Sequence, residues 1–265
     1  MTSVRSAIEA ANQEGRAALI GYLPAGYPSV EGSIELVRCM VKAGVDIVEV
    51  GLPYSDPVMD GPTIQAAAEA ALAAGTRTTD IFRVVEASAA LAPTVVMTYW
   101  NPVERFGVDR FAASLADAGG AGLITPDLIP DEADEWIEAA GHHGLDKIFL
   151  VAPSSTRERL EMTCRASSGF VYATAVMGVT GARDQSSTAA PELVHRVREV
   201  TDLPVGVGLG VSNGQQAAEV SSFADAVIVG SALVRVIAEA ADSAGALSAL
   251  GELTGDLALG VRREL

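Results

Sequence analysis

Short, nearly continuous apolar segments recur along the chain, and stretches with helical periodicity separate them. The eight segments that we expect to be strands are residues 17–23, 46–52, 94–100, 122–128, 147–153, 169–175, 204–210 and 225–231. Apolar strands separated by helices are typical of a parallel sheet that is covered on both faces. Eight such units in 265 residues predict an α/β fold, a (β/α)8 TIM barrel forming one domain over residues 1–265. A doubly wound open sheet is the alternative, although no early GxGxxG motif supports it.

An apolar stripe and characteristic end residues mark the helices. We expect helices at residues 2–13, 30–43, 63–74, 79–91, 232–239 and 243–258. Gly44 suits the C′ position that ends the second of these helices, and Pro62 suits the first turn of the third. Two of the helices fall between the second and third strands. The prediction is therefore a barrel with an extra N-terminal helix and an extra helix after strand 2.

Composition and charge narrow the function classes. Apolar residues make up 49% of the chain, enough to bury a sizeable core, and the formal charge of −16 argues against nucleic-acid binding. No stretch approaches the roughly 20 apolar residues of a membrane-spanning helix, and the first residues lack the apolar core of a secretory signal. We therefore expect a cytoplasmic protein without membrane segments. Cys39 and Cys164 lack metal-ligand spacing, so we expect no metal site.

A glutamate lies near the end of the second apolar segment, and a loop with two more carboxylates follows it. Residues 46–63 read DIVEVGLPYSDPVMDGPT, with Glu49 in the expected strand and Asp56 and Asp60 in the loop. Burying a carboxylate is costly, so a glutamate in an apolar strand has a partner or a raised pKa. A raised pKa suits a general acid, which makes Glu49 and Asp60 candidates for proton transfer. The alternatives are an ion pair for Glu49 and an Asx-type turn before Gly61 for Asp60, while Asp56 suits a loop-shaping role.

Glycine-rich turns follow the last three expected strands, at residues 176–183, 206–212 and 229–232. Such glycines let backbone N–H groups approach an anion, and helix N-termini add partial positive charge. Barrels commonly hold phosphate in the loops after strands seven and eight. Ser212 suits an N-cap, with Gln215 three residues further on. Each glycine alone could be a simple turn residue. The last two turns contain no Lys or Arg, so neutral donors would hold any phosphate there.

The segment from Glu49 to Gln65, EVGLPYSDPVMDGPTIQ, resembles the signature of the tryptophan synthase alpha chain family. The resemblance extends over the whole chain and includes GVTG at 178–181, GLG at 208–210 and GS at 230–231. It implies a (β/α)8 lyase that cleaves indole-3-glycerol phosphate to indole and glyceraldehyde 3-phosphate in tryptophan biosynthesis. The implied partner is a beta chain, in an alpha2beta2 heterotetramer. The resemblance implies pyridoxal phosphate on the beta chain and no cofactor on this chain.

The resemblance also implies roles for individual residues. Glu49 matches the catalytic acid–base, and Asp60 matches the carboxylate that handles the indole N–H. The matching substrate-binding positions are Tyr22, Tyr99, Tyr172, Thr180, Gly181, Gly208, Gly210, Gly230 and Ser231. Two loops, 53–62 and 176–190, would project from the catalytic face, with the second forming a mobile lid.

The chain departs from its relatives at a few positions, and other enzyme classes share parts of its pattern. Ala175-Val-Met stands where many relatives have Ser-Arg, and Leu209 and Tyr54 stand where some have Phe. Indole-3-glycerol phosphate synthase or a phosphosugar isomerase would need a lysine at a strand end, whereas Lys42 falls in a helix and Lys147 at a strand start. A glycosidase with two carboxylates would leave the glycine-rich turns unexplained. A non-catalytic partner of a beta chain would not need intact Glu49 and Asp60.

Overall fold

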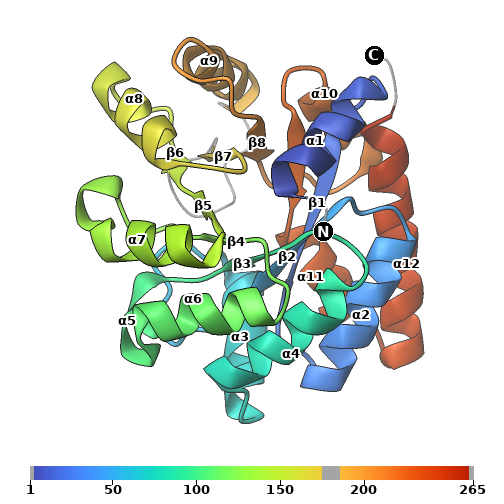
Figure 1. Cartoon of the computed structure of the whole chain (residues 1–265). Helices are drawn as coiled ribbons and strands as arrows, with labels where there is room; N and C mark the ends of the chain where they lie inside the picture. The colour runs from blue at the N-terminus through green and yellow to red at the C-terminus, as the bar shows by residue number, and fades with distance from the viewer. Residues whose placement is uncertain (1–2, 175–185, 263–265) are drawn as a thin grey trace.

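The computed structural model describes residues 3–174 and 186–262, and parallel strands form a barrel surrounded by helices (Figure 1). The strands are β1 (Ala18–Pro24), β2 (Ile47–Gly51), β3 (Thr94–Met97), β4 (Gly122–Ile124), β5 (Asp146–Ile148), β6 (Leu150–Val151), β7 (Val171–Thr174), β8 (Val205–Gly208) and β9 (Ala226–Val229). Their order in the sheet is β5-β4-β3-β2-β1-β9-β8-β7-β6. Because β5 and β6 at the two ends of this order are joined by Phe149 alone, the ring closes through the chain itself. The predicted TIM barrel is thus confirmed.

The strand prediction needs correction at the strand ends and at the fifth strand. The strands predicted at 94–100 and 122–128 end at Met97 and Ile124, Trp100 begins α5, and Ser231 begins α11. The single expected strand at 147–153 is two short segments, β5 and β6, interrupted at Phe149. The Phe149 side chain is buried in the layer between the barrel and the helices. Its carbonyl still accepts the N–H of Tyr172 at 3.2 Å, so the ladder to β7 continues across the interruption.

The six helices whose bounds the sequence predicts begin and end within two residues of the predicted positions. The described helices are α1 (Val4–Gln13), α2 (Val30–Lys42), α3 (Pro62–Ala73), α4 (Thr78–Ala89), α5 (Trp100–Phe106), α6 (Val108–Asp117), α7 (Asp134–His143), α8 (Arg157–Ala166), α9 (Ser186–Arg198), α10 (Gly214–Ser221), α11 (Ser231–Ala238) and α12 (Ser243–Gly260), with a 3-10 turn at Pro130–Glu132. Pro62 is at the first helical position of α3, and Gly44 has φ +119° beyond α2, as expected. The extra helix after strand 2 is confirmed, but the interval between β3 and β4 also holds two helices, which the sequence analysis missed.

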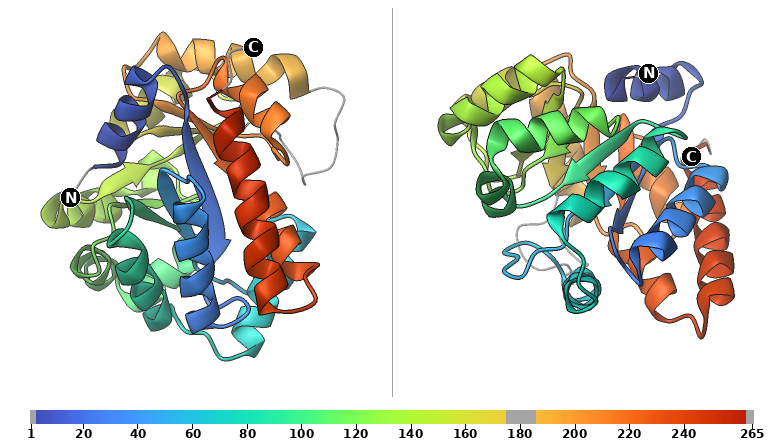
Figure 2. Two further views of the ribbon diagram at one scale, coloured as in Figure 1. Left: turned by 90° about the vertical axis from the view of Figure 1, so that its right-hand side faces the viewer. Right: turned by 60° about the horizontal axis from the view of Figure 1, so that its bottom comes forward.

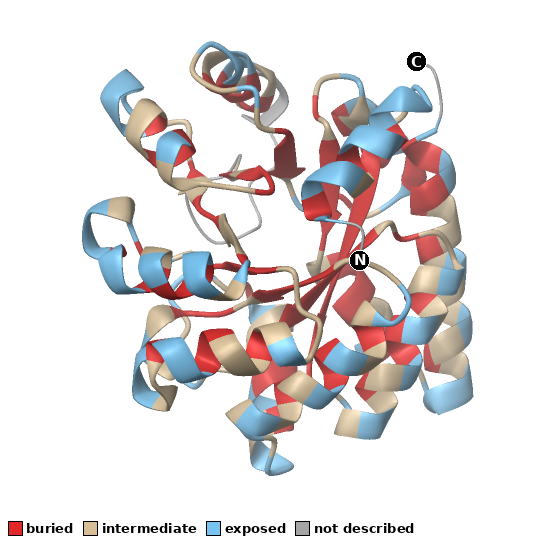
Figure 3. Cartoon of the chain, viewed as in Figure 1, coloured by how far each residue is buried: buried red, intermediate tan, exposed pale blue. Residues whose placement is uncertain are grey.

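Alternation along the strands separates two buried layers. Val48 and Val50 face outward into the large core between the barrel and the helices, whereas Ile47 faces the barrel interior. The interior layer also contains Val4 and Ile8 of α1, so this helix closes the N-terminal end of the barrel. Figure 3 shows the strands buried and the outer faces of the helices exposed. Glu49 is two residues beyond Ile47 and therefore faces the interior, toward the carboxyl ends of the strands.

The C-terminal helix runs along the outside of the barrel. α12 packs against α2, α10 and α11, and Figure 2 shows it lying lengthwise beside α2. Leu250 and Leu257 of α12 are fully buried in these contacts. The close approach leaves little space, because a Cβ on Gly44 would lie 2.7 Å from the Cβ of Ala258. α2 in turn contacts β1 and β2, the strands that carry Tyr22 and Glu49.

Candidate active site

The described candidate residues gather at the carboxyl ends of the strands. Tyr22 lies on β1, Glu49 on β2 and Tyr172 on β7, while Tyr99 directly precedes α5 after β3. In the β1–β2 register Tyr22 is the partner of Glu49. The remaining described candidates follow the last two strands and comprise Gly208, Gly210, Gly230 and Ser231. Thr180 and Gly181 lie outside the described residues, as does Ala175-Val-Met. The carboxyl end of a barrel is where TIM-barrel enzymes place their chemistry.

Glu49 is a buried carboxyl with its second oxygen unpaired. Glu49 is only 2% exposed, and its Oε2 atom has no hydrogen-bond partner among the described residues. Burial raises the pKa of Glu49 from 4.5 to about 8, and the negative charge of Asp60 contributes to the increase. No ion pair involves Glu49 among the residues that the structure describes. At neutral pH this carboxyl is therefore mainly protonated and can act as an acid.

Asp60 lies in the loop between β2 and α3, held from two sides. The Tyr99 hydroxyl donates a hydrogen bond to Asp60 Oδ1 at 2.8 Å. The Gln65 amide donates to the Asp60 carbonyl oxygen at 2.7 Å. Burial raises the pKa of Asp60 above its usual range, while the hydrogen bond from Tyr99 opposes the increase. Two neighbouring carboxyls of unequal environment can share acid and anion roles, since the charge on one favours the proton on the other.

Two further tyrosines lie close to Glu49. The pKa of Tyr172 is raised by burial and by the charge of Glu49. The pKa of Tyr22 is raised mainly by burial, and also by the charges of Asp60 and Glu49. Both phenols therefore stay protonated. Each ring occupies space that a glycine leaves open. A Cβ on Gly208 would lie 2.7 Å from the Tyr172 hydroxyl oxygen, and one on Gly51 would overlap the Tyr22 hydroxyl. The two glycines are therefore needed for the tyrosines to reach the barrel mouth.

A cavity of about 310 Å³ opens beside these side chains. The predicted site residues that line it are Asp60, Tyr172, Gly208, Gly210 and Ser231. The sequence analysis missed its apolar wall, formed by Ile64, Met97, Ile124, Pro126 and Leu150. Met97, Ile124 and Leu150 could have been found from strand alternation, because they end the inward-facing rows of β3, β4 and β6. An apolar cavity with a few polar groups suits a ligand that has an aromatic part.

The glycine-rich segments at the ends of β8 and β9 also line the cavity, through Gly208, Gly210 and Ser231. Ser231 is the first residue of α11, and Gly230 directly precedes it. Gly210 has φ +71°, which lets the chain turn sharply after β8. The predicted cap at Ser212 is wrong: Asn213 caps α10, and its side chain accepts the Gln216 N–H at 2.9 Å. Asn213 directly precedes the first turn of α10. The Ser212 N–H instead donates a hydrogen bond to the Gln216 side-chain oxygen.

Part of the predicted lid at 176–190 needs correction as well. Residues 186–190 belong to the first turns of α9, and the earlier part of the predicted lid lies outside the described residues. The loop at 53–62 does project from the catalytic face as expected. Its tip carries Val58 and Met59, which are 76% and 47% exposed, and Ile129 is a third exposed apolar residue, in the segment after β4. The Ser55 hydroxyl donates to Asp56 at 2.6 Å, in agreement with a loop-shaping role for Asp56.

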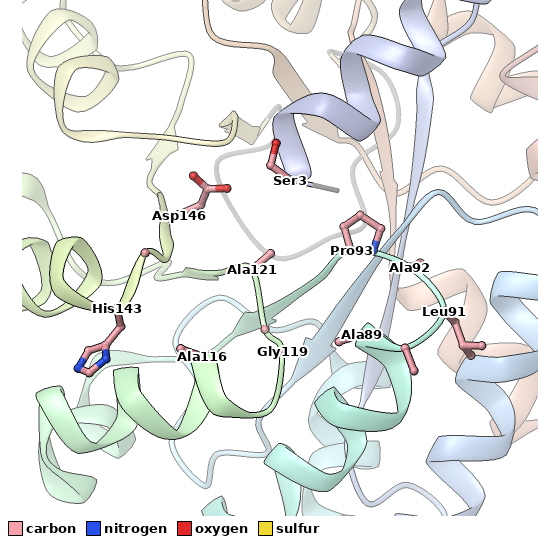
Figure 4. Close-up of a pocket in the computed structure, with 13 residues that line it drawn as sticks. Ser3, Ala89, Leu91, Ala92, Pro93, Ala116, Gly119, Ala121, His143 and Asp146 are labelled. Atoms are coloured by element: carbon pink, nitrogen blue, oxygen red, sulfur yellow. The ribbon is translucent and has the colours of Figure 1, made fainter. Parts of the chain in front are cut away.

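A second, larger pocket lies at the opposite end of the barrel (Figure 4). Its volume is about 500 Å³, and the segments leading into β3, β4 and β5 line it together with Ser3. Asp146 is a half-buried carboxyl there, and its partial burial raises its pKa while a hydrogen bond with Ser168 opposes the increase. Barrels use this end for stability rather than for chemistry, so we place the active site at the Glu49–Asp60 end.

The described side chains offer little for a metal or for lysine chemistry. Within residues 3–174 and 186–262, no group of three or more His, Cys, Asp or Glu side chains could hold a metal ion. Lys42 is in the last turn of α2, and Lys147 is in β5 at the amino end of the barrel. The chemistry available at the barrel mouth is therefore proton transfer between carboxyls and a ligand. Over the same described ranges, no helix is long and apolar enough to cross a membrane.

Known proteins share this arrangement over the full chain. The sequence profile described as tryptophan synthase alpha chain matches residues 8–258. The tryptophan synthase alpha chain of Acidothermus cellulolyticus is 60% identical over 264 residues, covering 99% of this chain and 98% of that one. That of Salinispora tropica is 62% identical over 263 residues, with 99% and 98% covered.

Solved structures give the same result in three dimensions. A chain of Mycobacterium tuberculosis tryptophan synthase superimposes with a TM-score of 0.92 at 57% identity, with 100% of both chains covered. The alpha subunit from Legionella pneumophila superimposes with a TM-score of 0.88 at 32% identity, with 98% of each chain covered. Sequence and structure agree with the paired carboxyls and the glycine-rich turns, and we conclude that this chain belongs to the tryptophan synthase alpha chain family.

Proposed function

We propose that Glu49 and Asp60 perform the acid–base chemistry of the reaction that this family catalyses. That reaction cleaves indole-3-glycerol phosphate to indole and glyceraldehyde 3-phosphate in tryptophan biosynthesis, as the alpha subunit of tryptophan synthase. One observation carries the proposal. Glu49 is buried with a pKa of about 8, and its neighbour Asp60 lines the cavity with a hydrogen bond that favours the anion.

The cleavage needs a proton to enter the indole ring and another to leave the glycerol chain. Indole leaves poorly as a carbanion, so the Glu49 carboxyl first protonates the ring carbon C3 and forms an indolenine. The Glu49 carboxylate then removes the proton of the C3′ hydroxyl. The C3–C3′ bond breaks as the aldehyde forms, and its electron pair restores the indole ring. Glu49 ends the cycle protonated, so one carboxyl acts as both acid and base.

Asp60 has a different task in this scheme. Protonation of the ring carbon places positive charge on the indole nitrogen, and a carboxylate beside the N–H stabilises that charge. The effect is large in a site that excludes water, because the anion is already oriented before the reaction. Asp60 is suited to this role because it lies at the cavity wall and accepts the Tyr99 hydroxyl.

The two ends of the substrate would contact different sides of the barrel mouth. We assign the indole end to the region of Tyr22, Tyr99 and Tyr172. The phosphate end would bind the turns that contain Thr180, Gly181, Gly208, Gly210, Gly230 and Ser231. The N-terminus of α11 at Ser231 supports this assignment, since main-chain N–H groups and the helix dipole attract a phosphate without Lys or Arg.

The partner of the family is the tryptophan synthase beta chain, in an alpha2beta2 tetramer. We propose that this chain itself needs no cofactor and that pyridoxal phosphate belongs to the beta chain. The proton transfers above require none, because each uses an oxygen that the chain supplies. A cytoplasmic location is part of the same proposal, since the substrate is a phosphorylated metabolite.

An indole-release assay tests the proposed function. Purified chain is incubated with indole-3-glycerol phosphate in the absence of pyridoxal phosphate, and both products are quantified. Indole and glyceraldehyde 3-phosphate should form in equal amounts. Addition of a beta chain without serine should increase the rate. Failure to release indole, alone and with a beta chain, would refute the function, and a strict need for added pyridoxal phosphate by the isolated chain would refute the cofactor proposal.

A further inference from the structure

Tyr99 makes contacts that differ from those of a residue that only lines a ligand pocket. Its residue is 3% exposed, and it is not among the described residues that line the 310 Å³ cavity. Its hydroxyl is instead engaged on both sides by the loop between β2 and α3. It donates to Asp60 Oδ1 at 2.8 Å and accepts the Met59 N–H at 3.0 Å. A hydroxyl has one proton to donate, so the donor capacity of Tyr99 is directed at Asp60.

The chain also fixes the position of the Tyr99 ring. Tyr99 is the residue before α5 with φ −70° and ψ 159°, so the end of β3 and the start of α5 set its backbone. The Tyr54 ring packs against it with centroids 5.4 Å apart. A ring whose backbone is set by a strand end and a helix start presents its hydroxyl to the loop at a fixed point. Tyr54 belongs to this loop, whose tip at Val58 is 76% exposed, so the loop contacts Tyr99 through a ring as well as through Met59 and Asp60.

We infer that Tyr99 is a positioning residue: its hydroxyl holds the Asp60 carboxylate in the orientation in which it faces the cavity. This inference rests on the proposed role of Asp60. The hydrogen bond is charge-assisted when Asp60 is ionised, and such bonds are roughly twice as strong as neutral ones. Tyr99 thereby favours the anionic form that is needed next to a developing positive charge. The accepted Met59 N–H fixes the loop backbone one residue before Asp60, so the carboxylate and its main chain share one anchor.

The first test compares Tyr99→Phe with Tyr54→Phe in the alpha–beta complex. Tyr54 is a matched control, because Phe keeps the ring that packs against Tyr99 and the described residues provide no hydrogen-bond partner for the Tyr54 hydroxyl. Tyr99→Phe should lower kcat for indole release by roughly tenfold to a hundredfold, the effect of losing one hydrogen bond to a charged group, and change KM little. Tyr54→Phe should keep the wild-type kcat. A raised KM at unchanged kcat in Tyr99→Phe would overturn the inference and leave Tyr99 as a pocket residue.

A double-mutant comparison separates positioning from general support. In an Asp60→Asn background the carboxylate is absent, so removing the Tyr99 hydroxyl should cause no further loss of kcat. An additional loss of the same size as in the wild type would overturn the inference, because the hydroxyl would then act independently of Asp60.

A titration without substrate remains informative even if the chain released no indole. The groups that face Asp60 are Tyr99 beyond β3, Glu49 on β2 and Tyr22 on β1. Removing the Tyr99 donor should raise the pKa of Asp60, and the 13C chemical shift of the Asp60 carboxyl measures this pKa. If the chain is active, the acidic limb of its pH profile of kcat should move to higher pH as well. If Tyr99→Phe proved unfolded, 3-fluorotyrosine at the same position, a stronger donor, should lower the pKa of Asp60 instead. An Asp60 titration that neither change moves would overturn the inference.

Discussion

Replacing Glu49 with glutamine separates the energetic and the chemical consequences of its burial. Glutamine has nearly the shape of a protonated glutamate, but it cannot ionise. In the folded wild-type protein the pKa of Glu49 is about 8, whereas its ordinary value is 4.5. The folded state therefore binds this proton more tightly than the unfolded chain. Its contribution to stability is fully present below pH 4.5 and is lost progressively as the pH rises to about 8.

The magnitude follows from the size of the pKa difference. Each pKa unit corresponds to about 1.4 kcal/mol, so the wild type should lose about 3 kcal/mol from this group between pH 4.5 and 7. The complete loss, reached only once the pH has risen well above 8, should be about 5 kcal/mol. Glu49→Gln lacks this dependence. The difference in unfolding free energy, variant minus wild type, should therefore grow by the same amounts over these intervals.

Urea unfolding at several pH values measures this difference, and indole release measures the chemical effect. Glu69→Gln removes a charge from an exposed position of α3 and serves as the control. Loss of a general acid–base should reduce turnover of Glu49→Gln by about a hundredfold to ten-thousandfold, with substrate still bound. Unfolding curves of variant and wild type that run parallel from pH 5 to 8 would refute the raised pKa. Near-normal turnover in a folded variant would remove Glu49 from the mechanism.

Three further predictions concern the rest of the site and the partner. Asp60→Asn should lower kcat by about a hundredfold or more at an unchanged melting temperature, and a mild effect would reduce Asp60 to loop support. Gly208→Ala should displace the Tyr172 ring, because its Cβ would lie 2.7 Å from the hydroxyl oxygen, and should raise KM in steady-state assays. Gly141→Ala in α7 is its control, since the added Cβ would meet nothing within 4 Å, and equal KM values in the two variants would contradict the steric argument. Indole release by the isolated chain should be slow and should increase with a beta chain, and equal rates with and without it would contradict dependence on the partner.

The sequence was most informative where burial on both faces left few choices. A strand such as β9, Ala226–Val229, is recognisable because parallel strands inside a barrel are apolar on both faces. Gly44 and Pro62 marked helix ends through backbone properties that belong to the residues themselves. α5 escaped prediction because it is 7 residues long and contains Pro102, so it presents no full apolar stripe. At α10, Ser212 and Asn213 are both good caps, and the residue types alone do not decide between them.

The candidate site divides in the same way. The sequence predicts Glu49 and Asp60 as site residues because carboxyls in and beside an apolar strand are costly to bury. The hydrogen bond between Tyr99 and Asp60 joins residues 39 positions apart, and no local sequence pattern predicts it. Phe149, which interrupts the fifth strand, likewise looks like any other apolar residue in its segment.

Local residue chemistry thus determined the alternation of strands and helices and the presence of glycines near the strand ends. The closed barrel decided that Glu49 faces inward, how strongly it is desolvated, which side chains surround Asp60 and where the cavity opens. Desolvation depends on every atom that displaces water around a group, and those atoms come here from strands distributed over the whole chain. The sequence pattern identifies the two carboxyls, but the folded barrel determines their pKa values.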